Sequence, residues 1–187
     1  MNERIPDREL LEQARAGDHG AFRTLVQRYE PVVAATVIGM LGPGAEAEDV
    51  GQETFIGFYS ALDRFREEAS LKTYLTRIAI NLSLNAVKRR RRFLARHVDG
   101  DSIQTNLPDP QLDPADRADS LETRERVRRA IERLPSKQRA VVTLRLIDGY
   151  STRETAGVLG VPEGTVQSRL SRALKKLEAY LQPLAER

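Results

Sequence analysis

The sequence predicts an all-α protein of two small helical domains joined by a flexible acidic linker, with a helix-turn-helix in the C-terminal domain. Apolar residues recur at intervals of three and four along most of the chain, and apolar and polar residues nowhere alternate over a useful length. A stretch rich in proline and aspartate interrupts this helical pattern near the middle of the 187 residues. A helix pair with a central glycine follows near the C-terminus. The predicted boundaries are 1–97 for the first domain, 98–120 for the linker and 121–187 for the second domain.

Residues 98–120 have the composition of a linker. They contain three prolines, and six aspartates against one arginine give a net charge of −5. Because large apolar side chains are scarce, this stretch is expected to stay flexible and unpacked. The flanking domains have net charges of +2 for 1–97 and +6 for 121–187. Basic domains on either side of an acidic connector fit a nucleic-acid partner for the two ends.

Capping and helix-breaking residues set the limits of the predicted helices. Asp7 is placed to cap the first helix, and the Gly42-Pro43-Gly44 run separates the second helix from the third. Pro31 lies inside the second helix, where a kink or a break is expected. The predicted helices cover residues 8–16, 21–40, 45–62 and 71–92 in the first domain, and 121–134 and 136–148 in the second.

The stretch YSTRETAGVLGVPEGTVQSRLSRALKKL, which begins at residue 150, has the spacing of a helix-turn-helix. Residues 152–159 are expected to form its first helix. Gly160 then supplies the left-handed backbone of a tight turn. Pro162 fixes a helical φ where the second helix starts.

The two faces of the second helix differ in character. Ala156 lets the two helices cross closely, and the β-branched Val166 fills the gap between them. Apolar residues fall on one face, as the helical period requires: Val166, Leu170, Ala173, Leu174 and Leu177. The opposite face carries Gly164, Gln167, Ser168, Ser171, Arg172 and Lys175. Exposed amides, hydroxyls and cations are what major-groove readout uses, so we interpret the pair as DNA-binding. The alternative is an ordinary amphipathic hairpin with a solvated charged face.

The helix over residues 71–92 carries a second candidate nucleic-acid surface. Beside a buried stripe of Leu71, Leu75, Ile78 and Leu82 lies a strip of Tyr74, Arg77, Asn81, Lys88 and Arg92. Rings and guanidinium planes stack unpaired bases, amides read base edges, and cations follow phosphates. The loop before this helix, residues 63–67, holds an aromatic residue between two arginines. The alternative is a solvated, charged helix end.

The helix over residues 45–62 has an acidic face edged by apolar residues. Asp49 and Glu53 lie one turn apart, and Phe55 and Ile56 follow. Paired carboxylates can bind a divalent metal or act as acid and base. However, no histidine lies near them in sequence, and no phosphate loop or nucleophile motif is present. We interpret this face as a protein-docking surface, with a solvated helix face as the alternative.

Composition excludes several classes of function. The chain has no cysteine, which excludes a disulfide framework and a thiolate metal site, and its only histidines are His19 and His97. No catalytic residue, metal or other cofactor is predicted, and the chain is not expected to be an enzyme. No apolar stretch approaches the ~20 residues that span a bilayer, and the charged N-terminus lacks the apolar core of a signal peptide. A cytoplasmic protein without membrane insertion is expected.

Four segments occur in the order AEDVGQETFIGFYSAL, DRFREEASLKTYLTRIAINLSLNAVKRRRR, LPSKQRAVVTLRLIDGYS and VLGVPEGTVQSRLSRALKKL. With the first two helices they cover nearly the whole chain. In this order they resemble the bacterial RNA polymerase sigma factors of the extracytoplasmic-function (ECF) group. The resemblance implies a factor that directs core RNA polymerase to specific promoters and assists promoter melting. It also implies one copy per holoenzyme, promoter DNA as a ligand and an anti-sigma factor as a further partner.

The resemblance implies a role for each candidate surface. The residues that match the segment docking on the polymerase clamp helices are Asp49, Gln52, Glu53, Phe55 and Ile56. The residues that match the part capturing the melted minus-ten element, where a base is extruded into a pocket, are Arg64, Phe65, Tyr74, Arg77, Asn81 and Lys88. The residues that match the reader of the minus-thirty-five element are Thr165, Gln167, Ser168, Arg169, Arg172 and Lys175.

Three positions depart from the family pattern. Tyr74 stands where Trp is usual, and Gly51 stands where an aliphatic residue is usual, at a cost of about 1 kcal/mol in local helix stability. Gln167 replaces a usual Lys or Arg, and its amide can pair with adenine. The alternatives are a sigma-like decoy that sequesters an anti-sigma regulator without binding DNA, a dimeric repressor or activator, and a metal-dependent nuclease. The intact basic residues argue against a decoy, and the docking helix and linker argue against a dimeric regulator.

Overall fold

The computed structural model describes residues 5–96 and 116–182 and confirms the all-α prediction, because no strand occurs in these two ranges. Two short irregular helices, η1 (Leu62–Arg64) and the π-helical η2 (Thr143–Ile147), accompany the α-helices. The α-helices are α1 (Asp7–Arg15), α2 (His19–Leu41), α3 (Ala45–Ser60), α4 (Leu71–Arg96), α5 (Asp116–Glu132), α6 (Ser136–Val142), α7 (Thr152–Leu159) and α8 (Glu163–Leu181). None of these described helices combines the length and the hydropathy that a bilayer span requires.

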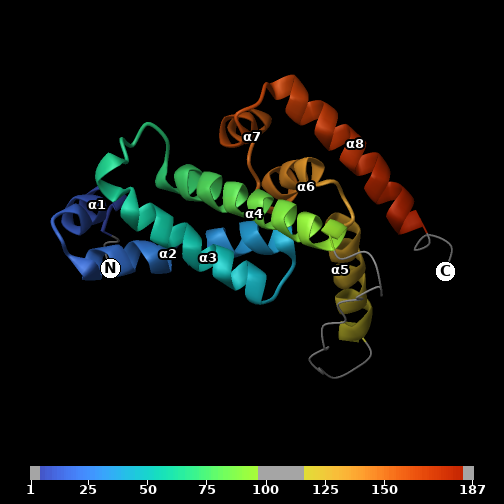
Figure 1. Ribbon diagram of the computed structural model, residues 1–187, viewed down its shortest axis with the longest axis horizontal. Helices are drawn as coiled ribbons and strands as arrows, with labels where there is room; N and C mark the ends of the chain where they lie inside the picture. The colour runs from blue at the N-terminus through green and yellow to red at the C-terminus, as the bar shows by residue number, and fades with distance from the viewer. Residues whose placement is uncertain (1–4, 97–115, 183–187) are drawn as a thin grey trace.

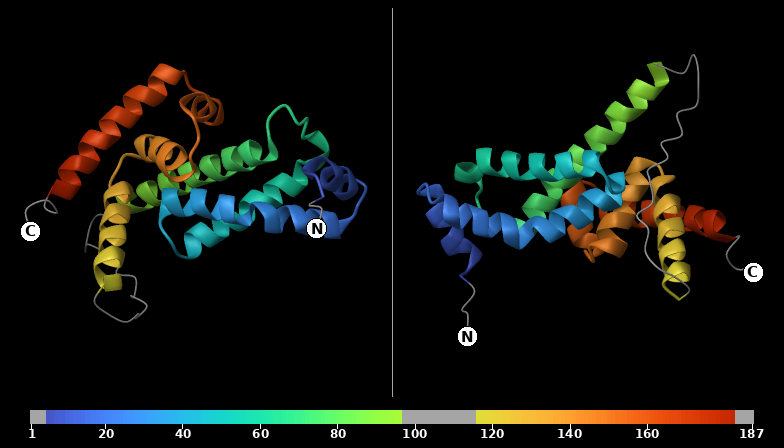
Figure 2. Two further views of the ribbon diagram at one scale, coloured as in Figure 1. Left: turned by 180° about the vertical axis from the view of Figure 1, so that it is seen from behind. Right: turned by 90° about the horizontal axis from the view of Figure 1, so that it is seen from below.

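The helices form two layers that meet along α4. Helices α2, α3 and α4 pack against one another, and α1 closes one end of this bundle (Figure 1). Helices α6 and α7 lie over α4 and connect it to α8, while α5 descends at the far end (Figures 1 and 2). The C-terminal helices therefore rest directly on the N-terminal bundle.

One hydrophobic core crosses from the N-terminal helices into the C-terminal helices. Its fully buried N-terminal members include Leu25, Phe58 and Leu75. The same cluster contains C-terminal residues: Ala140, Leu144, Tyr150 and Val158. Two smaller clusters hold the C-terminal helices together, one around Ala173 and Leu177 and one formed by Val141, Ala156 and Val166. The two predicted domains are thus packed together, with the division at 98–120 still a prediction.

The structure corrects two expectations for the first helices. Asp7 does not cap α1, because its carboxylate accepts hydrogen bonds from the Arg28 guanidinium and the Tyr29 hydroxyl on α2, and Pro6 occupies the cap position. Pro31 was expected to cause a kink or a break, and the break is wrong, because α2 is continuous from His19 to Leu41. The proline faces solvent, while Val33 and Val37 anchor the following turns in the core.

Several helix ends differ from those predicted. Helix α5 begins at Asp116 and so takes in the last residues of the predicted linker, and α4 continues to Arg96. Most of the predicted linker, residues 98–115, lies outside the described residues. Pro162 is the residue before α8 and has an extended backbone, with φ −60° and ψ 149°, so the helix itself begins at Glu163.

Candidate nucleic-acid interface

The turn between α7 and α8 has the geometry that the sequence predicts. Gly160 ends α7 with φ 62° and ψ 39°, the left-handed conformation that glycine adopts without strain. The backbone N–H of Val161 donates to the Ala156 carbonyl at 3.1 Å and closes the turn. Ala156 and Val166 pack together with Val141, as the predicted crossing requires. The helix-turn-helix prediction is confirmed in its backbone and in its packing.

A capping box fixes the start of α7, a feature that sequence reasoning missed. The Ser151 hydroxyl accepts from the Glu154 backbone N–H at 3.2 Å, and the Glu154 carboxylate accepts from the Ser151 N–H at 2.7 Å. These bonds satisfy two backbone donors that would otherwise have no partner. Hydrogen bonding of the Glu154 carboxylate to the Ser151 hydroxyl and to the Ser151 backbone N–H lowers the pKa of Glu154. The signal was present in the sequence as Ser-Thr-Arg-Glu directly before an apolar helix.

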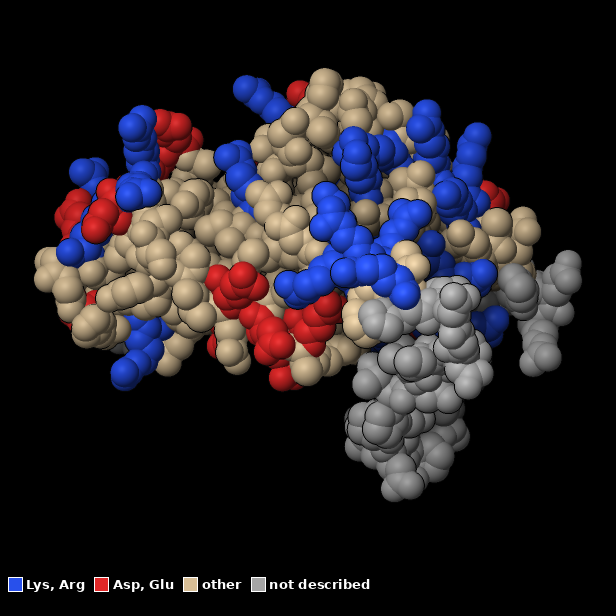
Figure 3. Space-filling model, viewed as in Figure 1, with Lys and Arg blue, Asp and Glu red and all other residues tan. Residues whose placement is uncertain are grey.

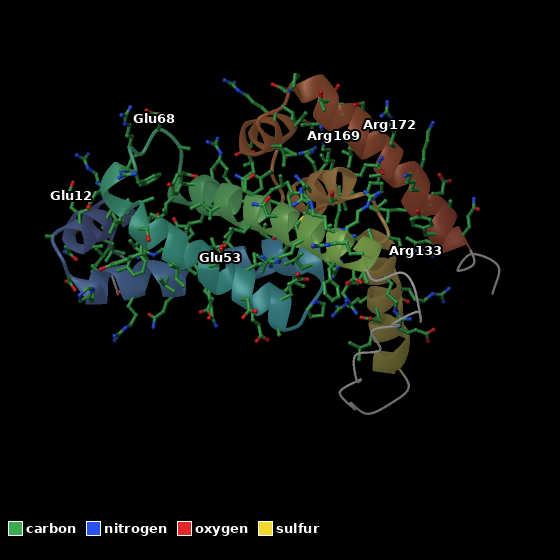
Figure 4. All side chains as sticks on the ribbon, in the orientation of Figure 1. Glu12, Glu53, Glu68, Arg133, Arg169 and Arg172 are labelled. Carbon is green, nitrogen blue, oxygen red and sulfur yellow. The ribbon has the colours of Figure 1, made fainter. Side chains whose placement is uncertain are left out.

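Helix α8 presents a polar and basic face to solvent. This face carries Arg169 and Arg172, both labelled in Figure 4, and also Thr165, Gln167, Ser168 and Lys175. Thr165 and Arg169 are partly buried, and the other four residues are exposed. Arg169, Arg172 and Lys175 form no ion pair with another residue of the described ranges. These charges are therefore available to phosphate groups.

The apolar stripe of α8 is narrower than predicted. Val166, Ala173 and Leu177 are buried, whereas Leu174 is 46% exposed. Leu174 and Leu170 instead line a shallow hollow on the outer side of the helix, together with Gln167 and Lys175. This surface combines apolar and hydrogen-bonding groups.

The strip predicted on α4 is present, and its residues differ in exposure. Arg77, Asn81 and Lys88 are exposed, while Tyr74 is partly buried. The Tyr74 ring lies 4.7 Å from the Phe65 ring, between centroids, and meets the Phe58 ring edge-on at 6.1 Å. Phe65 is only 6% exposed, so its ring supports Tyr74 from the core side.

Basic and acidic surfaces are separated on the face shown in Figure 3. Lys and Arg gather over the C-terminal half of α4 and along α8, and Asp and Glu gather over α3. The α4 cations come from the run Lys88–Arg92, in which Arg90 pairs with Glu46 at 3.5 Å. The basic surface therefore extends over both halves of the molecule.

The acidic surface borders an open groove of about 700 Å³ between α2 and α3. Its apolar wall comes from both helices and includes Val37, Ile38, Phe55 and Ile56, and Ile56 is 65% exposed. Four acidic and amide residues of α3 lie along or beside it, all of them exposed: Glu48, Asp49, Gln52 and Glu53. An apolar groove with an acidic edge suits an amphipathic helix with a basic flank.

No group of three or more His, Cys, Asp or Glu side chains within the described ranges is arranged to hold a metal ion. The carboxylates of Asp49 and Glu53 thus have no third ligand of this type beside them. A metal-dependent cleavage site on α3 has no support in this part of the chain.

Sequence reasoning missed the contact between the two halves, which buries a second face of α4. One face packs toward α3, where Ile78 approaches Gly57. On another face the hydroxyls of Thr76 and Tyr150 are hydrogen-bonded at 2.8 Å, and both residues are buried. The signal in the sequence was weak, because the fully buried Thr76 and Ser83 are polar and do not continue the apolar stripe of α4.

Further polar contacts connect the halves. The Thr36 hydroxyl on α2 lies 2.9 Å from Oδ2 of Asp148, and Arg139 donates to the Met40 carbonyl at 2.6 Å. Burial raises the pKa of Asp148 to about 6, against the opposing effects of the Thr36 hydrogen bond and the nearby Lys72 ammonium. Burial also lowers the pKa of the Arg139 guanidinium.

Comparison with known proteins assigns both halves to the same class. Residues 25–93 match the family model "Sigma-70 region 2", and residues 124–177 match "Sigma-70, region 4". The first match contains the α4 strip, and the second contains α7, the turn and α8 as far as Leu177. The fold and these surfaces define a protein of the sigma-70 type.

Full-length relatives narrow the class. The chain is 38% identical to the ECF RNA polymerase sigma-E factor of Salmonella typhimurium over the whole of both proteins. It is 34% identical to the RNA polymerase sigma-H factor of Pseudomonas aeruginosa over 95% of each. The structure of CnrH in complex with the cytosolic domain of CnrY matches with a TM-score of 0.66 at 31% identity, covering 95% of this chain and 97% of CnrH. The chain belongs to the ECF sigma factor family, as the order of its four segments predicts.

Proposed function

We propose that this protein directs core RNA polymerase to specific promoters and assists promoter melting at the start of transcription. The observation that carries the proposal is the presence, in one chain, of both sigma-70 regions, each with an exposed surface suited to its task. The protein would act in the cytoplasm as one copy per holoenzyme and without chemistry of its own. We assign residues 1–97 to polymerase docking and the minus-ten element, 98–120 to a linker, and 121–187 to the minus-thirty-five element.

The acidic groove of α2 and α3 is the proposed polymerase site. Exposed Ile56 and half-buried Phe55 supply apolar contact area, and Asp49, Gln52 and Glu53 supply polar contacts at its edge. Such a surface binds a helical partner through an apolar seam and orients it through opposite charge. Because CnrH is solved with the cytosolic domain of CnrY, we also propose a regulatory protein partner, an anti-sigma factor.

The α4 strip is the proposed minus-ten site. Tyr74 offers a ring for stacking an unpaired base, and Phe65 holds that ring in place from the core side. The amide of Asn81 can read a base edge, and Arg64, Arg77 and Lys88 can follow the strand backbone. A tyrosine in place of the usual tryptophan gives a smaller stacking area.

Helix α8 is the proposed reader of the minus-thirty-five element. Arg172 and Gln167 are the residues best suited to reading base edges, because a guanidinium recognises guanine and an amide recognises adenine. The remaining residues of this face, Thr165, Ser168, Arg169 and Lys175, suit phosphate and sugar contacts.

A transcription assay tests the proposal. Purified protein, bacterial core RNA polymerase and a genomic promoter library would be combined, and the new transcript starts sequenced. Starts that depend on the protein and share two upstream elements are the expected result. Binding to polymerase without any new start would favour the decoy that sequesters a regulator, and the absence of polymerase binding would refute both. An Asp49→Asn/Glu53→Gln variant serves as the matched control, since it should lose polymerase binding and keep its fold.

A further inference from the structure

The contact between the two halves reaches Arg77 of the α4 strip, whose side chain stays exposed. The Arg77 guanidinium donates to the Gly157 carbonyl on α7 at 2.9 Å, and Tyr150 packs beside it against Thr76. One N–H group of this guanidinium is thus taken by α7, and α7 lies beside the position that DNA would approach. That Arg77 contacts DNA at all rests on the function proposed above.

Asp148 lies where three elements of this contact meet. It follows η2, its Oδ2 lies 2.9 Å from the Thr36 hydroxyl of α2, and the Lys72 ammonium approaches from α4. Lys72 does not form an ion pair with Asp148 and lies instead over the Tyr150 ring, 4.8 Å from its centroid. On its own side of the contact, the titratable neighbour of Asp148 is the Tyr150 phenol, which also has the Glu154 carboxylate nearby.

Burial raises the pKa of Asp148, and the Thr36 hydroxyl opposes this rise where it donates to the carboxylate. The same hydroxyl can also bond to a protonated carboxyl. The Thr36 hydroxyl has one hydrogen but two acceptors within reach, the Val32 carbonyl at 3.0 Å and Asp148 Oδ2 at 2.9 Å. When Asp148 is ionised, the Thr36 hydroxyl can donate its hydrogen either to the Val32 carbonyl or to Asp148, but not fully to both. A protonated Asp148 can donate to the Thr36 oxygen while Thr36 donates to Val32, so both bonds form.

We propose that Asp148 is the proton-sensitive part of a latch that holds η2 and α7 closed against α4, beside the strip. Protonation of its carboxyl favours the closed arrangement described here, and ionisation favours separation of the two halves. The latch would therefore regulate access of DNA to Arg77 and its neighbours.

The direction of the effect follows from proton linkage. Separation exposes the half-buried Asp148 more fully to water, where its pKa returns toward the ordinary value of 3.8, whereas the closed form has a pKa of about 6. The closed form binds more protons between these values, so it loses stability as pH rises through them. The ratio of closed to open molecules is expected to fall about tenfold from pH 5 to pH 7.

A distance measurement on the whole chain tests the latch without polymerase or DNA. The protein has no cysteine, so Ser60→Cys on α3 and Ala179→Cys on α8, both exposed positions, allow two fluorescent labels to be attached. Energy transfer between the labels at pH 5 and pH 7 reports the closed fraction. A falling closed fraction is expected in the wild-type background. An unchanged fraction would overturn the proposal.

Two variants and one control sharpen the test. Asp148→Asn mimics the protonated carboxyl, so its closed fraction at pH 7 should equal that of the wild-type protein at pH 5. This closed fraction should not change with pH, and a change with pH would overturn the role of Asp148. Gly39→Ala places a methyl 2.7 Å from the Thr143 side chain of η2 and should open the protein at both pH values. An unaffected closed fraction in Gly39→Ala would show that the α2–η2 contact does not form in solution. Glu9→Gln, which removes an exposed carboxylate of α1, should match the wild type.

Transcription at pH 7 then separates the latch from the proposed function. With limiting core polymerase, Asp148→Asn should need about tenfold more protein than the wild type, following its closed fraction. Equal transcription by both proteins, together with the expected energy transfer, would refute the effect of the latch on DNA access to the strip. If the wild-type protein itself started no promoter-specific transcript, the proposed function would fail, and the energy-transfer result would still decide the latch.

Discussion

The hydrogen bond between Thr76 and Tyr150 provides a direct test of the closed packing. Both side chains are buried, with exposed fractions of 0% and 4%, and their hydroxyls lie 2.8 Å apart. Tyr150→Phe leaves the Thr76 hydroxyl buried without this partner, which typically costs about 1–3 kcal/mol. Thr76→Val removes the other hydroxyl at nearly constant volume. Replacing both partners removes the unpaired group, so the double variant should be nearly as stable as the less destabilised single one.

The assay is a double-mutant cycle in urea, followed by circular dichroism at 222 nm. We expect a coupling free energy of about 1 kcal/mol between the two hydroxyls. Tyr59→Phe is the control, because the Tyr59 ring is 48% exposed and its substitution should change the free energy of unfolding by less than about 0.5 kcal/mol. A coupling free energy of zero would show that the two hydroxyls do not meet in solution, and the closed arrangement would then not be the populated one.

Three further predictions concern the proposed DNA surfaces. Ser151→Ala removes the capping box of α7 and should lower the free energy of unfolding by about 1 kcal/mol, measured by urea titration; an unchanged midpoint would mean that the cap adds nothing. Arg172→Ala should weaken promoter use by about 1–3 kcal/mol, measured as promoter-specific transcription over a range of protein concentrations, whereas unchanged transcription would exclude base reading by Arg172. Asn81→Ala should slow promoter opening in a stopped-flow assay and leave polymerase binding intact; loss of polymerase binding would instead assign Asn81 a structural role.

The helices and the helix-turn-helix could be predicted because local physics decides them. The left-handed turn at Gly160 and the crossing of Ala156 with Val166 depend on residues within one short stretch, and the structure reproduces both. Helix ends were less predictable where distant residues compete for a capping group. Asp7 is the clearest case, since Arg28 and Tyr29 take its carboxylate.

The candidate surfaces could be located, but the exposure of single residues could not. Phe65 and Arg64 are neighbours in sequence, yet one ring is buried beside Tyr74 and the other side chain is exposed. Leu174 fits the apolar period of α8 but lies outside the packed stripe, because the partners of α8 cover only part of that face. Burial of this kind depends on which helices meet, and helical periodicity alone does not contain that information.

The contact between the halves was missed because its chemistry differs from that of an ordinary core. The face of α4 toward α3 is apolar, with Ile78 near Gly57, and the sequence shows it as a regular stripe. The contact with the C-terminal half combines apolar residues such as Leu144 and Val158 with the hydroxyls of Thr36, Thr76 and Tyr150 and the Asp148 carboxyl. Polar groups of this kind can exchange each protein partner for water when the halves separate, at a small net cost in hydrogen-bond free energy. Interfaces between parts of one chain that move relative to each other are commonly of this polar type. The apolar face therefore suits permanent packing, and the polar groups of the second face lower the cost of the opening that the proposed latch requires.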